Sequence, residues 1–486
     1  MRLNKVNIQN FRCFKNYEVL LAKKTTVLLG KNGTGKTSLI AAIKKGLSFL
    51  FASSPNYTHS LNTANNCNVR SFTLWDARFD EIERNFSLPI KNDFFATYNN
   101  KEIEWTFLKK KDPGSLHPTL YKNALESILT DYNADAENIS LPLIAYFSDS
   151  YPHILSNVGE KASRIARMDV LPRDFGYYGW DEDTNCAELW QRRFIKIVNY
   201  VTDFENELNR LEKDIAVFET PTNSESNENL SIKAVLRERF QKLKNNADLC
   251  LKYRIEISFI EYKIFTFTAP LREELNFINQ EFQINRIYVN RPDRKSSSIE
   301  FSFVDNKTMH FDILPAGYRR LLSIVFDIAY RSYILNEGKL TEGVVMIDEI
   351  ELHLHPTLQQ DVLERFQKTF PGIQFIISTH SPLVASNLKA DGVENKILNL
   401  ENNGMNYSNH LVENVYGIDY ATNLSEIMEV APRPSTIDKY INGYVFLMNK
   451  DKEDEAKKML EKLKEYLGGE IPNLLQKEID NQIKSK

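Results

Sequence analysis

The chain has 486 residues with 61 basic and 65 acidic side chains, so its net charge is −4, and 42% of its residues are hydrophobic. This length allows two or three domains, or one large domain with an insertion, and excludes a small disulfide-stapled scaffold. The four scattered cysteines, the absence of an apolar stretch near the roughly 20 residues of a membrane span, and a first segment without a signal core predict a cytoplasmic protein without membrane contact.

The chain begins with short strand patterns followed by a glycine-rich turn. β-Rich runs at residues 17–21 and 25–29 are separated by two lysines, and the second run ends at a glycine. Residues 38–51 then carry apolar side chains at helical spacing. The sequence therefore predicts a glycine-rich loop between a buried strand and the N-terminus of a helix.

This loop, residues 30–37, has the pattern GxxxxGK[ST] in the strand–helix context that the motif requires. Its glycines allow main-chain N–H groups to close around phosphate oxygens, and the helix N-terminus adds a partial positive charge. Lys36 is predicted to reach the β- and γ-phosphates of ATP, and Thr37 to ligate Mg²⁺. The predicted nucleotide-binding residues are Gly30, Lys31, Asn32, Gly33, Thr34, Gly35, Lys36, Thr37 and Ser38.

A long insertion follows, and its clearest segment carries apolar residues at 4-3-4-3 spacing. These residues are Trp190, Phe194, Ile197, Val201, Phe204, Leu208, Leu211, Ile215 and Phe218. After the polar stretch 219–229, a second periodic run extends from Ile232 to Leu251. Two such helices form either an antiparallel coiled-coil arm or the core-facing stripe of a globular helical subdomain. The spacing is compatible with both interpretations.

The second half of the chain contains a β-hairpin pattern and two buried strands. Residues 283–311 read as the hairpin with a polar turn at 291–298, and the apolar runs 344–347 and 375–377 are typical of a parallel sheet covered on both faces. Asp348 and Glu349 end the first run, and His380 follows the second. We expect Asp348 to hold Mg²⁺, Glu349 to polarise the attacking water and His380 to contact the γ-phosphate.

Other polar clusters in the sequence do not point to one function. His353 and His355 form an HxH pair without a nearby third ligand, so a structural or dimer-contact role is favoured over a metal site. Basic groups at 109–111 and at Arg291, Arg294 and Lys295 are candidates for nucleic-acid contact, although surface charge without such a role is commoner. From about Ser435 the chain reads as helical and charged, with a glycine stop at 468–469.

These motifs resemble the ABC-type ATPase heads of the RecF, SMC and OLD group. Residues 8–14 are similar to that group's opening motif I-x-N-F-R-x-F, which adds Arg12 to the nucleotide-binding residues. The resemblance also implies a signature motif that acts on a partner's ATP. Its counterpart is residues 314–320, LPAGYRR, where Pro315 replaces the serine of the family motif and Gly317 is retained. The expected fold class is α/β, an ABC-type P-loop ATPase head with a mainly helical insertion and a helical C-terminal tail.

A narrower resemblance is to the PtuA ATPase family of Septu antiphage systems. It rests on residues 141–147, 176–181, Cys186, Trp190, 314–320, 348–356 and 415–419. It implies a homodimer or higher oligomer that hydrolyses ATP and controls an HNH nuclease partner. The complex is expected to contact nucleic acid, either as a standalone system or in a retron with a reverse transcriptase, its noncoding RNA and msDNA. The alternative is a RecF-type DNA-repair or recombination clamp without a nuclease partner.

The residues do not predict a nuclease site in this chain. The 106 residues after His380 (486 − 380) contain no DxD, and the acidic run 181–183 is interpreted as a solvated loop. Cleavage of nucleic acid is therefore expected from another polypeptide. We expect an N-terminal ATPase lobe at 1–150, a helical insertion at 151–282, a lobe with the signature motif, Asp348 and His380 at 283–430, and a helical partner-docking segment at 431–486.

Overall fold

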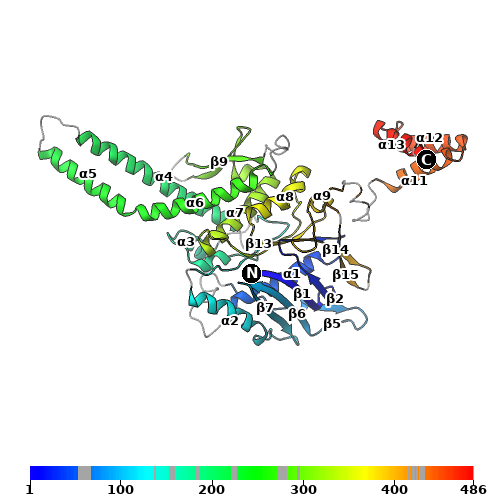
Figure 1. Ribbon diagram of the computed structural model, residues 1–486, viewed down its shortest axis with the longest axis horizontal. Helices are drawn as coiled ribbons and strands as arrows, with labels where there is room; N and C mark the ends of the chain where they lie inside the picture. The colour runs from blue at the N-terminus through cyan, green and yellow to red at the C-terminus, as the bar shows by residue number, and fades with distance from the viewer. Residues whose placement is uncertain are drawn as a thin grey trace. The chain divides into compact units, whose positions relative to one another are not determined.

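The computed structural model describes most of the chain. The described residues are 1–52, 67–135, 138–152, 159–181, 186–219, 227–271, 282–292, 296–404, 406–413, 415–418, 422, 425 and 433–484. They divide into two compact units, Met1–Gly417 and Ile418–Lys486, and Figure 1 shows their elements.

The first unit is built on a six-stranded sheet in the order β15-β14-β3-β13-β12-β8. Its strands are β3 (Thr25–Leu29), β8 (Leu143–Phe147), β12 (Gly343–Ile347), β13 (Ile373–Ser378), β14 (Asn395–Asn402) and β15 (Tyr407–Leu411). Five strands pair in parallel, and β15 is an antiparallel edge. Every residue of β3, β12 and β13 is buried, which is why these strands appear as continuous apolar runs. The predicted common sheet is confirmed.

A four-stranded antiparallel sheet, in the order β2-β1-β6-β7, packs against helix α1 (Lys36–Leu47). Its strands are β1 (Arg2–Phe11), β2 (Phe14–Leu20), β6 (Ile90–Tyr98) and β7 (Lys101–Lys109). Trp105 on β7 donates to the carbonyl oxygen of Gly46 at 3.0 Å, and a Cβ at Gly46 would lie 2.1 Å from the ring of Phe94. Because α1 also contacts β13, it lies between the two sheets. The predicted helix is confirmed, and its last turn at 48–51 is a 3-10 helix.

Helices α7 (Ala316–Asn336) and α8 (Pro356–Thr369) complete the core, with Phe366 of α8 contacting Phe375 of β13 at 5.4 Å between ring centroids. The predicted β-hairpin is confirmed as β9 and β10, although residues 293–295 of its turn lie outside the described residues. The remaining elements of this unit include β4 (Arg78–Asp80), β5 (Asn85–Ser87), α2 (Thr119–Ala134), α3 (Glu160–Ala166), β9 (Ile284–Asn290), β10 (Ser298–Phe303), β11 (Thr308–His310) and α9 (Pro382–Ser386).

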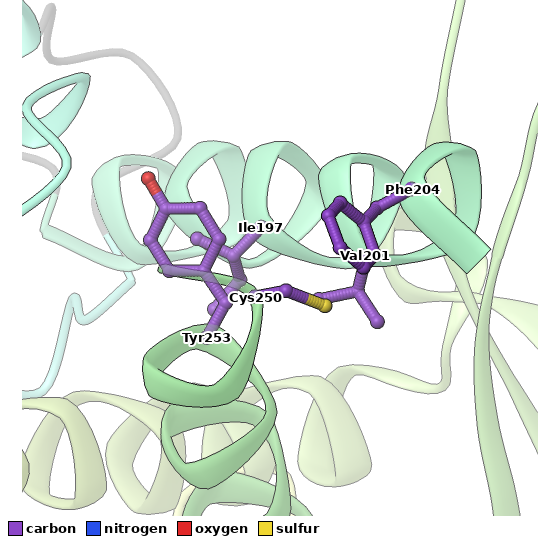
Figure 2. Close-up of a cluster of buried hydrophobic side chains, with 5 residues drawn as sticks. All are labelled: Ile197, Val201, Phe204, Cys250 and Tyr253. Carbon is purple, nitrogen blue, oxygen red and sulfur yellow. The ribbon is translucent and has the colours of Figure 1, made fainter. Parts of the chain in front are cut away.

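Among the described residues, the predicted insertion contains α3 and the longer helices α4 (Cys186–Glu219), α5 (Asn227–Asn245) and α6 (Ala247–Thr268). The first part of α4 belongs to the core, since Trp190, Phe194 and Ile197 are fully buried. Farther along, a small cluster joins α4 to α6, and Figure 2 shows its members Ile197, Val201, Phe204, Cys250 and Tyr253. The outer part of α4 runs beside α5 as an antiparallel arm (Figure 1). Each of the two predicted interpretations therefore describes one part of the same helix.

The second unit includes, among its described residues, the helices α11 (Ser435–Met448), α12 (Glu453–Tyr466) and α13 (Asn473–Lys484). Leu463 and Ile479 are fully buried in its core. The glycines at 468 and 469 both have positive φ after α12, so the predicted helix stop is confirmed. Across both units, no helix of the described residues combines the length and apolarity that a membrane span requires.

Candidate nucleotide-binding site

Three predicted segments meet where neighbouring parallel strands end. Strand β3 leads into the glycine loop, β12 into Asp348 and Glu349, and β13, which lies between them, into His380. Parallel strands place their carboxyl ends at one edge of a sheet, where open α/β folds bind ligands. The sheet order therefore brings together Lys36 and Asp348, which are 312 residues apart in the sequence (348 − 36).

The glycine loop has a main-chain conformation that glycine adopts most readily. Gly30, Gly33 and Gly35 have φ of 141°, 81° and 96°. A Cβ at Gly30 would lie 2.5 Å from the carbonyl oxygen of Leu400, and one at Gly35 would lie 2.8 Å from the Phe14 ring. A Cβ at Gly33 would meet nothing within 4 Å. The loop is therefore packed at its two ends and open in the middle, where a phosphate group would fit.

Lys36 points into this loop and is only 6% exposed. Its Nζ donates to the carbonyl oxygen of Gly30 at 2.6 Å and to that of Lys31 at 3.1 Å. Burial lowers the pKa of Lys36, and the negative charges of the carboxylates after β12 oppose this shift. An ammonium group held among loop carbonyls, with acidic residues nearby, fits a site for nucleotide phosphates and a divalent cation.

The end of β12 is fixed by Ser378 on the neighbouring strand. The Ser378 hydroxyl donates to Oδ1 of Asp348 and accepts from the main-chain N–H of Glu349 at 2.9 Å. Glu349 has φ 48°, a left-handed conformation that costs a non-glycine residue about 1–2 kcal/mol. The hydroxyl of Thr37, which is exposed, and the carboxylate of Asp348 are oxygen ligands of the kind that Mg²⁺ prefers.

Arg320 is a site residue that sequence reasoning did not identify. It lies on α7, is 2% exposed, and its Nη1 donates to the carbonyl oxygen of Glu349 at 2.6 Å. Its Nη2 donates to the carbonyl oxygens of Asp348 at 2.8 Å and Ser148 at 3.0 Å. The signal in the sequence was that Arg320 is the second arginine of LPAGYRR. The sequence does not indicate which of the two adjacent arginines is buried.

Glu351 is a second residue that the sequence reasoning missed. Its carboxylate accepts from the Thr379 hydroxyl at 2.7 Å and from the main-chain N–H of His380 at 2.5 Å. These two hydrogen bonds fix the loop that carries the half-buried His380. The signal was a second glutamate two residues after Glu349, in DEIE.

Arg12 lies in the turn between β1 and β2, with φ 48°. Its guanidinium pairs with the buried carboxylate of Asp76 at 3.4 Å, and Asp76 also pairs with Lys45 in the last turn of α1 at 3.0 Å. The turn lies against the glycine loop, since a Cβ at Gly35 would be 3.1 Å from Sγ of Cys13. The structure therefore places Arg12 in a turn that borders this loop.

Gly317 of the signature motif is buried and packs within its own chain. A Cβ at this position would lie 2.4 Å from the main-chain oxygen of His353. Pro315 and Ala316, at the start of α7, are exposed instead. If this motif contacts a partner's nucleotide, the contact would be made by the exposed N-terminus of α7 and not by an exposed glycine. The role of Gly317 in such a contact stays a prediction.

His355, the second histidine of the HxH pair, has a local structural role. His355 caps α8, with its Nδ1 accepting from the main-chain N–H of Thr357 at 3.4 Å, and His353 has φ 63°. Among the residues that the structure describes, no three His, Cys, Asp or Glu side chains are grouped as a metal site would require.

The solvated-loop interpretation of the acidic run at 181–183 was wrong for Asp181. Asp181 is 7% exposed, because its carboxylate accepts from Nε of Arg70 at 2.5 Å. Residues 182–183 lie outside the described residues.

Two of the candidate basic residues for nucleic-acid contact already have partners. Lys109 is 4% exposed and donates to the carbonyl oxygen of Phe72 at 2.9 Å. Arg291 pairs with Asp203 on α4 at 2.8 Å. Arg294 and Lys295 lie outside the described residues.

Residues 1–385 match the AAA ATPase domain family, a stretch that contains the glycine loop, the carboxylates after β12 and His380. The chain belongs to this family. It is an ATPase with a P-loop in an α/β fold, and the predicted resemblance to PtuA and retron-associated ATPases is confirmed. An ATPase domain implies that the chain binds nucleotide.

Two relatives and one solved structure are similar to this chain. The retron Ec83 probable ATPase of Escherichia coli is 24% identical over 99% of this chain and 86% of its own length. The Septu protein PtuA of Bacillus mycoides (strain KBAB4) is 30% identical over 23% of this chain and 16% of its own length. A solved Smc head domain from Pyrococcus furiosus, bound to the C-terminal domain of ScpA, covers 85% of this chain and 96% of its own, with 13% identity and a TM-score of 0.42.

Proposed function

We propose that this chain is the ATP- and Mg²⁺-dependent regulatory subunit of an antiphage-defence complex. The observation that carries the proposal is the meeting of the glycine loop, Asp348 with Glu349, and His380 at the carboxyl ends of β3, β12 and β13. Similarity to ATPases named for retron and Septu systems supports the defence setting.

Each residue at this edge has a role in ATP hydrolysis. The loop N–H groups and Lys36 bind the phosphates, and the oxygens of Thr37 and Asp348 hold Mg²⁺, which neutralises phosphate charge when bound. Glu349 orients and polarises the attacking water, and His380 contacts the γ-phosphate. Ser378 and Glu351 keep Asp348 and His380 in place through the hydrogen bonds described above.

Two copies of the chain are proposed to pair head to tail around two ATP molecules. The N-terminus of α7, with Pro315 and Ala316 exposed, is the surface that meets the partner's nucleotide. A helix N-terminus carries a partial positive charge, which favours an anionic phosphate even where the serine of the family motif is absent. Higher oligomers can be built from such a dimer.

The dimer is proposed to control an HNH nuclease, either in a standalone system or in a retron with a reverse transcriptase and msDNA. Nucleic acid is then contacted through the complex. The second unit is the proposed docking segment, because its small three-helix core leaves large apolar side chains exposed. Phe446, Tyr466 and Leu474 are 57%, 54% and 82% exposed. Such side chains are typical anchors of protein interfaces.

The test is to tag the chain, express it with its neighbouring genes and identify every protein and nucleic acid that copurifies, with untagged cells as the control. A stoichiometric HNH protein supports the proposal, and a reverse transcriptase with an RNA–DNA hybrid assigns it to a retron. Recovery with recombination proteins on DNA, or of the ATPase alone, would favour the DNA-repair clamp. Light scattering of the purified chain with and without ATP tests the dimer.

A further inference from the structure

The first turn of α7 is joined directly to the main chain that carries the catalytic carboxylates. Arg320 donates three hydrogen bonds to carbonyl oxygens of Asp348, Glu349 and Ser148, at 2.6–3.0 Å. A planar guanidinium fixes several acceptors in one geometry, whereas a lysine ammonium lacks this fork. Arg320 therefore sets the positions of the strand ends of β12 and β8 relative to α7.

The acceptors explain why this link concerns catalysis. Two of the three carbonyls belong to Asp348 and Glu349, the residues proposed to hold Mg²⁺ and polarise water, and Glu349 has the left-handed φ of 48°. A main chain in a sparsely populated conformation persists only where neighbouring groups fix it. Arg320 on one side and Ser378 on the other supply such groups, since Ser378 accepts from the N–H of Glu349.

The rest of α7 is also held in place by buried polar contacts. Asp327, one turn before Arg331, pairs with its guanidinium and accepts from Nε1 of Trp190 on α4 at 2.9 Å. Arg331 also donates to the carbonyl oxygen of Gly176 at 2.9 Å. Because these residues are buried, α7 connects its exposed N-terminus with both the carboxylate turn and the base of the arm.

We propose that Arg320 is a positioning residue that transmits the position of α7 to the hydrolytic turn at Asp348 and Glu349. The inference rests on the proposed function, in which the N-terminus of α7 meets the partner's nucleotide. Arg320 does not contact the reacting atoms, so its effect is on the rate of hydrolysis rather than on the binding of ATP.

The test compares R320K and R320M with R365K and R365M in the full chain. Arg365 is the matched control, since it is also buried, lies on α8 outside the nucleotide site, and its Nη1 donates to the carbonyl oxygens of Phe267 at 2.7 Å and Ala269 at 2.8 Å. We expect R320K to lower kcat about 10- to 100-fold and R320M to lower it further, with the Kd for ATP within about twofold. The Arg365 variants should keep the wild-type kcat.

Three results would overturn the inference: an unchanged kcat in R320K, a Kd that rises in parallel with the loss of kcat, or an equal loss of kcat in R365K. If R320M does not fold, R320K with its melting temperature and Kd decides the question. Failure of the proposed function is distinguishable, because the wild-type chain would then show no ATP turnover, or the same turnover whether or not it forms dimers.

Discussion

The glycine loop and the N-terminus of α7 both carry glycines in motifs for nucleotide contact, yet the structure uses these glycines differently. In the loop, Gly33 faces open space and its neighbours are arranged around the Lys36 ammonium. In α7, Gly317 is packed against the main chain of His353, and the nearby Arg320 faces inward to the carboxylate turn. The first region is shaped for a ligand, whereas the second is shaped to hold the site together from within the chain.

The largest expected effect comes from removing the Lys36 ammonium. K36A should raise the Kd for ATP by at least about 100-fold, because a buried ammonium forms charge-assisted hydrogen bonds of about 1.5–3 kcal/mol each. Titration with a fluorescent ATP analogue measures this. The control is Lys457→Ala, which removes an exposed lysine of α12 outside the site and should leave the Kd unchanged. Wild-type affinity in K36A would contradict the loop assignment.

The second prediction separates chemistry from positioning among the acidic residues after β12. E349Q should lower kcat about 10²- to 10³-fold, because the amide cannot act as a base, and should allow ATP to accumulate in the dimer. E351Q should lower kcat about tenfold, because its neutral amide oxygen holds the His380 loop less strongly than a carboxylate does. Single-turnover phosphate release measures both, and a larger loss in E351Q than in E349Q would reverse the two roles.

The third prediction tests the contrast between the two glycines themselves. G317A should destabilise the protein by about 1–3 kcal/mol, because its Cβ collides with a main-chain oxygen that cannot rotate away. G33A should destabilise it by only about 1 kcal/mol, through its positive φ. Melting temperatures without nucleotide give the order, and ATP titration should show weaker binding in G33A and near wild-type binding in G317A. The opposite pattern would mean that Gly317, not Gly33, faces the ligand.

The smallest effect concerns pH. Burial lowers the pKa of Lys36 in the free protein. Its ammonium is charged at low pH and loses its proton as the pH rises, at a lower pH than an exposed lysine does. ATP affinity should therefore fall as the pH rises, beginning below the pKa of about 10.4 at which ordinary lysines lose their charge. In K36R, whose guanidinium stays charged at these pH values, the affinity should be lower but nearly independent of pH. The same pH dependence in both proteins would assign the titration to another group.

Local patterns in the sequence predicted much of this fold. The strand at 25–29, the loop at 30–37 and the helix after it depend on neighbouring residues, because glycine conformations, strand burial and helix initiation are local properties. The same holds for the glycine stop after α12. The arm could not be predicted from the sequence alone. A 4-3-4-3 spacing of apolar residues occurs both in a helix buried in the head, as at Phe194, and in a helix packed on another helix, as at Leu211.

By itself, the sequence determined the type of site: a glycine loop with Lys36 and Thr37, a strand that ends in Asp348 and Glu349, and His380 after another strand. Only the tertiary structure decided which residues support it. Arg320, Glu351 and Ser378 are chemically ordinary residues whose roles arise from partners 28–30 residues away or more. The buried Asp181 was misjudged for the same reason, since its partner Arg70 lies 111 residues away. Hydrogen bonds across strand ends depend on the order of the strands in the sheet, which local spacing does not encode.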